Sequence, residues 1–136
     1  MLSGLLFSNV ITVDDDGTAD YTNLNDAFNA SASGDSILVY QGIYTHPAVG
    51  GNNSVYINTS NLTLLGIEDG AEVYHPIIVD ASNVTIRSLN FYDGSYIGAS
   101  NGTKIINNIF QNIYKSLSRL EQPVVRHATG PWLPTI

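Results

Sequence analysis

Two acids and one arginine in the second half of the chain are candidates for acid–base chemistry. Asp80, Arg87 and Asp93 are spaced so that adjacent segments of a repeating fold could place them near one another. Paired carboxylates serve glycosidases, and an acid beside an arginine can help to remove a proton next to a substrate carboxylate. Scattered surface charge is the simpler interpretation of the same three residues.

Tyrosines recur along the chain and are candidates for carbohydrate contact. Aromatic rings pack on sugar rings, and the phenol adds a hydrogen-bonding group. If Val55 and Val73 point inward, the alternation of a strand turns Tyr56 and Tyr74 outward, and Tyr92 is a third candidate. The alternative is that these are ordinary surface tyrosines, which β-strands favour.

An acidic turn near the N-terminus is the one candidate for a metal site. Asp14, Asp16 and Asp20 surround Gly17, and oxygen ligands of this kind suit Ca²⁺. The spacing lacks the closing acid of an EF-hand, so an ordinary turn is the competing interpretation. The three histidines have no metal-ligand spacing, and we expect no other cofactor.

Several asparagines lie in N-glycosylation sequons. Asparagine also suits tight turns, because it tolerates the left-handed backbone conformation and bonds to nearby backbone groups. The sequence therefore predicts turns at these positions and allows glycans. The sequon asparagines are Asn29, Asn52, Asn58, Asn61, Asn83 and Asn101.

A short apolar strand that recurs at about 20 residues must position these side chains. The segments 62–66, 84–91 and 104–110 resemble one another, with 22 residues from Leu62 to Val84 and 19 from Phe91 to Phe110. One such unit cannot bury its own apolar face, so it stacks on the next one. The spacing predicts an all-β fold, a short parallel β-helix over residues 1–114.

One short helix interrupts this pattern near the N-terminus. Leu24, Ala27 and Phe28 fall on one helical face, and Thr22 is a suitable N-cap. We predict a helix over about 22–32 that covers the apolar interior of the first coil.

Residues 115–136 form a different kind of segment. They lose the Asn/Thr/Gly texture and carry Pro123, Pro131 and Pro134, which break regular elements. We expect this irregular tail to be a C-terminal cap, a disordered segment or a segment foreign to the original protein. If it is not a cap, the open edge of the solenoid invites self-association.

Three dipeptides favour a different fold. Asp69-Gly70, Asp93-Gly94 and Asn101-Gly102 are typical of two-residue hairpins, so an antiparallel sandwich is the alternative to the β-helix.

The charge balance narrows the partners. Twelve acids against five bases give a formal charge of −7, which disfavours nucleic acid and anionic lipid. No segment is long and apolar enough to predict a membrane span. There are no cysteines, so no disulfide or thiolate metal site forms.

The N-terminal third resembles a known superfamily. Ile11–Thr22, Leu24, Asp26-Ala27, Gly34–Val39 and Gly42–Tyr44 are similar to the opening of pectin-lyase-like right-handed parallel β-helix proteins, among them pectin methylesterases. The resemblance extends over roughly 10–114 and implies a right-handed β-helix with an N-terminal capping helix. The superfamily contains lyases, hydrolases, esterases and surface proteins without enzymatic activity. The Gln-Asp-Thr and Asp-Phe-Ile-Phe-Gly motifs of the methylesterases do not occur, so no catalytic residue is carried over.

Two functions follow from these observations. The first is a non-enzymatic extracellular or cell-surface β-helix module that acts as a scaffold, a filament subunit or a surface for polysaccharide or glycan. The second is a fragment or degenerate member of a polysaccharide-active enzyme of the pectate lyase, polygalacturonase or pectin esterase type, using Asp80, Arg87 and Asp93.

Overall fold

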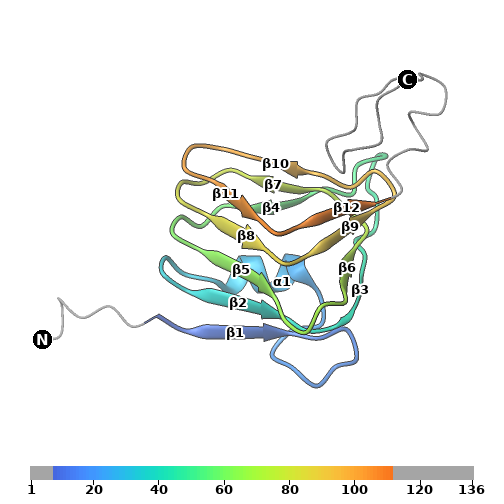
Figure 1. Ribbon diagram of the computed structural model, residues 1–136, viewed down its shortest axis with the longest axis horizontal. Helices are drawn as coiled ribbons and strands as arrows, with labels where there is room; N and C mark the ends of the chain where they lie inside the picture. Colours follow the sequence, from blue (N-terminus) through green and yellow to red (C-terminus); the bar gives the residue numbers. More distant parts are fainter. Residues whose placement is uncertain (1–7, 112–136) are drawn as a thin grey trace, which may run out of the picture.

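The computed structural model describes residues 8–111, which form a parallel β-solenoid with one helix (Figure 1). Successive coils stack so that each coil adds a strand to up to three sheets. A five-stranded sheet, with one strand from each coil, has the order β1-β2-β5-β8-β11. A four-stranded sheet has the order β12-β9-β6-β3, and a three-stranded sheet the order β10-β7-β4.

The strands are short, between two and four residues each. The five-stranded sheet contains β1 (Val10–Val13), β2 (Ser36–Val39), β5 (Thr63–Gly66), β8 (Thr85–Arg87) and β11 (Lys104–Ile106). The four-stranded sheet contains β3 (Gly42–Tyr44), β6 (Ala71–Val73), β9 (Asn90–Tyr92) and β12 (Ile109–Gln111). The three-stranded sheet contains β4 (Val55–Ile57), β7 (Ile77–Val79) and β10 (Ile97–Gly98).

The predicted repeat is confirmed by the strand register. Thr63 pairs with Thr85, Thr85 with Lys104, and Phe91 with Phe110, which are the 22- and 19-residue spacings of the sequence. All pairs between named strands are parallel, so the sandwich alternative is wrong. The Asp-Gly and Asn-Gly dipeptides instead form corners between sheets, because their left-handed residues can also turn a coil.

Left-handed residues stack at one corner. Gly34, Asn61, Asn83 and Gly102 each stand two residues before a strand of the five-stranded sheet, with φ of 94°, 61°, 57° and 75°. The Nδ2 of Asn83 donates to Oδ1 of Asn61 at 3.5 Å, and Nδ2 of Asn61 donates to Oγ of Ser33 at 2.9 Å. These side chains therefore tie successive coils together outside the core.

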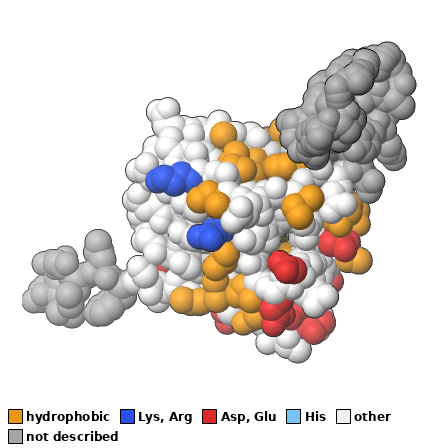
Figure 2. Space-filling view, in the orientation of Figure 1, with side chains coloured by type: hydrophobic (Ala, Val, Ile, Leu, Met, Phe, Trp, Pro, Cys, Tyr) orange, Lys and Arg blue, Asp and Glu red, His pale blue; other side chains and the backbone are white. Residues whose placement is uncertain are grey.

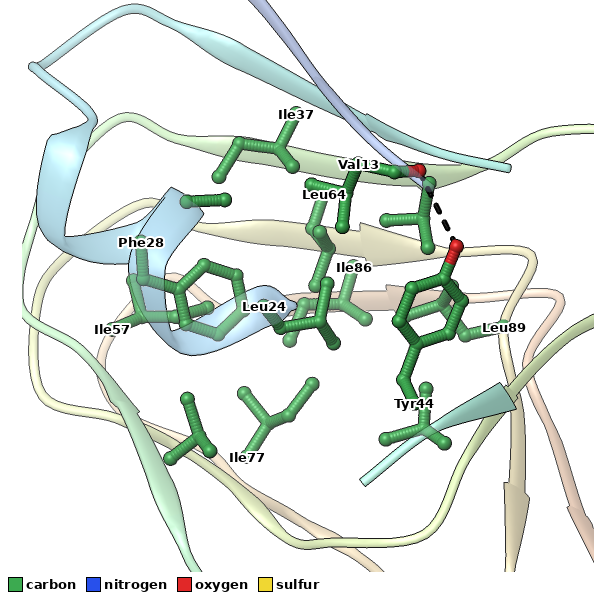
Figure 3. Packing of buried hydrophobic residues seen from close by; sticks show 14 of the residues in the cluster. Val13, Leu24, Phe28, Ile37, Tyr44, Ile57, Leu64, Ile77, Ile86 and Leu89 are labelled. Atoms are coloured by element: carbon green, nitrogen blue, oxygen red, sulfur yellow. Dashed lines mark hydrogen bonds between the residues drawn. The ribbon is translucent and has the colours of Figure 1, made fainter. Parts of the chain in front are cut away.

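The core runs through the centre of the coils. Inward-facing side chains stack on their equivalents one coil away, as Ile37, Leu64 and Ile86 do along the five-stranded sheet. Tyr44 lies in the same core and donates its hydroxyl hydrogen to the carbonyl oxygen of Tyr40, 2.7 Å away, and lies 3.3 Å from that of Val13 (Figure 3). Burial raises the pKa of Tyr44, so the phenol stays protonated as a donor.

Helix α1 (Leu24–Ala30) is shorter than the predicted 22–32 and begins two residues later. Asn23, not Thr22, is the N-cap, and its Oδ1 accepts from the Asp26 N–H at 2.8 Å. Ser31 is already extended, and the Asp35 carboxylate accepts from the Ala32 N–H at 2.8 Å, which starts the turn into β2. The predicted role is confirmed, since Leu24 and Phe28 point into the coil interior in Figure 3.

The strand boundaries also differ from the sequence prediction elsewhere in the chain. The repeated segments predicted at 62–66, 84–91 and 104–110 contain β5, β8 with β9, and β11 with β12, although β9 and β12 each extend one residue beyond them. The sequence pattern does not reveal β10, because two residues show no periodicity. The predicted tail, 115–136, lies outside the described residues, as does the end of the predicted 1–114 domain beyond Gln111.

Candidate functional site

Two exposed tyrosines lie at the outer face of the three-stranded sheet. Val55, Ile57, Ile77 and Val79 are buried, so the alternate residues Tyr56 and Ile78 face outward. The register places Tyr56, Ile78 and Gly98 in one row across β4, β7 and β10.

A second row lies beside the first. The Ile77 N–H donates to the carbonyl oxygen of Tyr96 at 2.9 Å, and the Val55 N–H donates to that of Pro76 at 3.0 Å, which places Pro76 and Tyr96 on adjacent coils. Tyr56 and Tyr96 are 43% and 51% exposed. We call the surface formed by Tyr56, Pro76, Ile78, Tyr96 and Gly98 the tyrosine platform.

The absence of a side chain at Gly98 makes room for Ile78 on the tyrosine platform. A Cβ at Gly98 would lie 3.0 Å from the Cδ1 of Ile78, so the Ile78 side chain already occupies the space above Gly98. No aromatic pair among residues 8–111 involves Tyr56 or Tyr96. Neither tyrosine face is therefore covered by another ring of the described chain.

A polar hollow of about 280 Å³ borders the carboxyl end of β7. It is lined by Asp80, Ala81, Ser82, Ser100 and Asn101. The Ser100 hydroxyl donates to the Val79 carbonyl oxygen at 2.6 Å, which holds the two coils together at its edge. No hydrogen bond within residues 8–111 uses the Asp80 carboxylate, so this group is available as an acceptor.

The other two predicted sugar contacts lie on a different sheet. Tyr92 ends β9 and Tyr74 follows β6, and their rings stack at 5.1 Å with an interplanar angle of 17°. The Tyr74 hydroxyl donates to Glu72 at 2.9 Å, which raises the pKa of Tyr74, and Gln111 donates to the Tyr92 hydroxyl at 3.1 Å. Because each ring covers one face of the other, this pair presents less ring face to a sugar than the tyrosine platform does.

The three predicted acid–base residues fall at the ends of strands in three different sheets. Asp80 follows β7, Arg87 ends β8 and Asp93 follows β9. No hydrogen bond in the described chain joins them. Asp80 lines the polar hollow.

The carboxylates of the acidic turn accept hydrogen bonds from nearby backbone N–H groups and threonine hydroxyls. Asp20 accepts from the backbone N–H and the hydroxyl of Thr12 at 2.9 and 3.1 Å, and Asp16 accepts from both groups of Thr18 at 3.0 and 2.8 Å. Asp14 accepts from the Asp16 N–H at 3.4 Å. Across residues 8–111, no three acidic, histidine or cysteine side chains gather as a metal site would require.

The ring of the buried His75 packs against the ring of the half-buried His46. The rings of His46 and His75 are 6.1 Å apart and edge to face, and His75 is buried beside the Pro76 carbonyl oxygen at 3.1 Å. Burial lowers the pKa of His75, and the neighbouring His46 lowers it further.

All six sequon asparagines are exposed. Asn61 and Asn83 form the predicted turns, with left-handed backbones and side chains that bond between coils. Two of these asparagines border the sheet that carries the tyrosine platform. Asn58 directly follows β4, and Asn101 lines the polar hollow. Glycosylation at all six positions stays a prediction.

Sequence reasoning missed Tyr96, Gly98 and Ser100 as parts of one surface. The alternation of Ser95, Tyr96 and Ile97 was a usable signal, but a two-residue strand is too short to reveal it. Only the pairing of β10 with β7 shows that these residues lie beside Ile78.

No protein-family model, curated protein or solved structure matches this chain. In the described part of the chain, α1 is too short to cross a membrane, and no helix long and apolar enough to do so is present.

Proposed function

We propose that this protein is a non-enzymatic β-helix module of the extracellular space or cell surface that binds neutral polysaccharide on its three-stranded sheet. Surface proteins without enzymatic activity are among the pectin-lyase-like proteins that this chain resembles. The tyrosine platform carries the proposal, because two exposed rings flank Ile78 and Gly98 beside a polar hollow.

The chemistry of the surface suits a sugar chain. Tyrosine rings and Ile78 offer apolar contact to the C–H face of a sugar, and the phenols offer hydrogen bonds. Asp80 and Asn101 can accept hydrogen bonds from sugar hydroxyls, since a carboxylate is an acceptor and an amide is both donor and acceptor.

The charge distribution favours a neutral chain over a uronate. Arg87 and Lys104 are the two basic side chains of residues 8–111, and both lie on the five-stranded sheet. In the view of Figure 2, the lysine and arginine side chains lie apart from the acidic ones. A polyanion at the tyrosine platform would meet the Asp80 carboxylate, and neither base of residues 8–111 lies on that sheet.

Binding to soluble xylan, galactan and β-glucan, measured by affinity electrophoresis with polygalacturonate as the charged comparison, tests the proposal. We expect Tyr56→Ala and Tyr96→Ala each to weaken binding several-fold, up to about tenfold, from lost ring contact. Tyr74→Ala is the aromatic control and should retain binding. Equal loss in all three variants, or no retardation by any neutral polymer, would refute the platform as the site.

The enzymatic alternative shares Asp80 with this proposal. An assay on pectin, polygalacturonate and alginate, with and without Ca²⁺, distinguishes the two. Release of unsaturated uronate, reducing ends or methanol that Asp80→Asn abolishes would favour the enzyme.

Self-association is the second part of the proposal, and the structure favours two copies meeting at their C-terminal coils. Within residues 8–111, β10, β11 and β12 are the last strands of their sheets, and Ile105 is 44% exposed there. Light scattering after size-exclusion chromatography should show a dimer that Ile105→Asp dissociates. A strict monomer at high concentration would remove this part and leave carbohydrate binding untouched.

A further inference from the structure

The corner between the five- and four-stranded sheets changes length along the solenoid. Four residues, 67–70, connect β5 to β6, whereas two residues connect β8 to β9 and β11 to β12. The longer turn carries two exposed acids, Glu68 and Asp69, both with left-handed backbones. The two extra residues leave a recess beside the shorter corners of the next two coils.

This recess is a pocket of about 380 Å³, lined by Asp69, Ser88, Asn90, Asn107 and Ile109 from three successive coils. Asp69, Ser88 and Asn107 have φ of 46°, 63° and 52°. Left-handed non-glycine residues cost backbone energy, and such residues concentrate at binding sites. The volume is at the lower end of ligand pockets, which matches a ligand of about one sugar ring.

The polar side chains of the pocket have no partners in the described chain. No hydrogen bond within residues 8–111 uses the side chains of Asp69, Ser88, Asn90 or Asn107. Asn108, the next residue, shows the contrast: its amide accepts from the Leu89 N–H and donates to the Ile86 carbonyl oxygen, both at 2.9 Å. Asn108 therefore holds two coils together, while the Asn107 amide is available to a ligand.

We propose that this corner pocket binds a neutral saccharide residue or a similar small polyhydroxylated ligand. The Asp69 carboxylate accepts from ligand hydroxyls, the two amides both donate and accept, and Ser88 adds a hydroxyl. Ile109 is 52% exposed and provides an apolar wall for the C–H face of the ring. Asp69 disfavours an anionic ligand, since the pocket lining holds no base.

The corner pocket is separate from the tyrosine platform. Its residues lie between the five- and four-stranded sheets, and the tyrosine platform lies on the three-stranded sheet. The inference rests on the pocket alone and stands whether or not the platform binds polysaccharide.

Titration of ¹⁵N-labelled protein with glucose, galactose, xylose and N-acetylglucosamine, with galacturonate as the charged comparison, tests the pocket. We expect at least one neutral sugar to shift the amide signals of residues 69, 88–90 and 107–109, with galacturonate weaker. Shifts at residues 56, 78, 96 and 98 would report the tyrosine platform separately.

Three variants and a control locate the ligand. Asn107→Gly keeps a residue suited to positive φ and removes the amide, Asn90→Ala removes the second amide, and Asp69→Asn removes the charge. Each should raise the dissociation constant about three- to tenfold. Asp93→Asn is the matched control, since Asp93 has φ of 56° and lies outside the pocket, and it should bind as the parent does.

Two results would overturn the inference. One is the absence of shifts at the corner with every sugar up to solubility. The other is a corner shift that survives Asn107→Gly and Asn90→Ala in variants whose remaining spectrum shows the native fold.

Discussion

The two ends of the solenoid are built differently. At the N-terminal end, the outer edge of β1 is bonded: the Thr12 N–H donates to Asp20 at 2.9 Å, and the Thr12 carbonyl oxygen accepts from the Tyr21 N–H at 3.0 Å. The outer edge of β3 is also bonded, because the Ile43 N–H donates to Asp15 at 2.9 Å. These bonds occupy edge groups with which another chain would otherwise pair.

Helix α1 closes the interior at the same end. It packs against β1 and β4, and Leu24 and Phe28 point into the coil interior (Figure 3). The acidic turn that resembled a calcium loop thus belongs to a seal made of carboxylates on the strand edges and a helix over the core.

The C-terminal coil repeats the inward pattern without such a seal in the described chain. Ile105 pairs with Ile86 and faces the same interior, yet Ile105 is 44% exposed and Ile86 is fully buried. Phe110 stacks on Phe91 at 5.0 Å and is only partly buried. Burial of an inward side chain therefore depends on a layer on each side of it, and the asymmetry favours association through the C-terminal coil alone.

The largest effect should come from opening the sealed end. Phe28→Ala should lower the free energy of unfolding by about 3–5 kcal/mol, the usual cost of deleting a buried phenylalanine. Phe110→Ala should cost clearly less in urea unfolding, because Phe110 is partly exposed. Equal losses would mean that the C-terminal coil is as well covered as the N-terminal one.

The second-largest effect should come from Gly66 in β5, midway between the two ends of the solenoid. A Cβ at Gly66 would clash with the backbone oxygen of Ser88, so Gly66→Ala must push β5 away from the coil above it. We expect a loss of about 1–3 kcal/mol, typical of overpacking. Hydrogen exchange should show coils from β8 onward losing protection first, since stacked coils contact only their neighbours.

Gly98→Ala is the control for that variant. Its Cβ would meet the flexible end of Ile78 at 3.0 Å, which can move. A loss equal to that of Gly66→Ala would contradict the view that backbone contact sets the cost.

The third effect tests the edge seal. Asp20→Ala removes the acceptor of two Thr12 bonds and should cost about 1–2 kcal/mol, while Asp93→Ala, in a turn without such bonds, should cost less. Thermal unfolding with and without Ca²⁺ checks the competing role of Asp14, Asp16 and Asp20. A large Ca²⁺-dependent rise in Tm that Asp20→Ala abolishes would restore the calcium interpretation.

The smallest effect concerns the middle of the stack. Burial lowers the pKa of His75 below its ordinary 6.5, so between the two values the unfolded state binds more protons than the folded state. The stabilising contribution is complete above pH 6.5 and is lost as the pH falls toward the folded pKa. Urea unfolding between about pH 8 and pH 5 should show this loss, reduced in His75→Gln. An unchanged slope in His75→Gln would assign the loss to the carboxylates.

The sequence by itself determined the stacking and the facing of the strands. Apolar residues at 22- and 19-residue spacing can be buried only against their own copies, so the parallel repeat, the inward Val55 and Val73 and the outward Tyr56 followed without coordinates. The left-handed turns at Asn61 and Asn83 followed too, because local backbone preference decides them.

The tertiary structure alone decided which side chains meet across coils. Sequence could not show that Asp15 and Asp20 bond strand edges, that Tyr74 stacks on Tyr92, or that Tyr96 joins Tyr56 around Ile78. The corner pocket depends on turns of unequal length stacked on one another. Except for the bond between Asp20 and Thr12, these contacts join residues of different coils, and their geometry is fixed by how far each turn displaces the next coil, which no local pattern records.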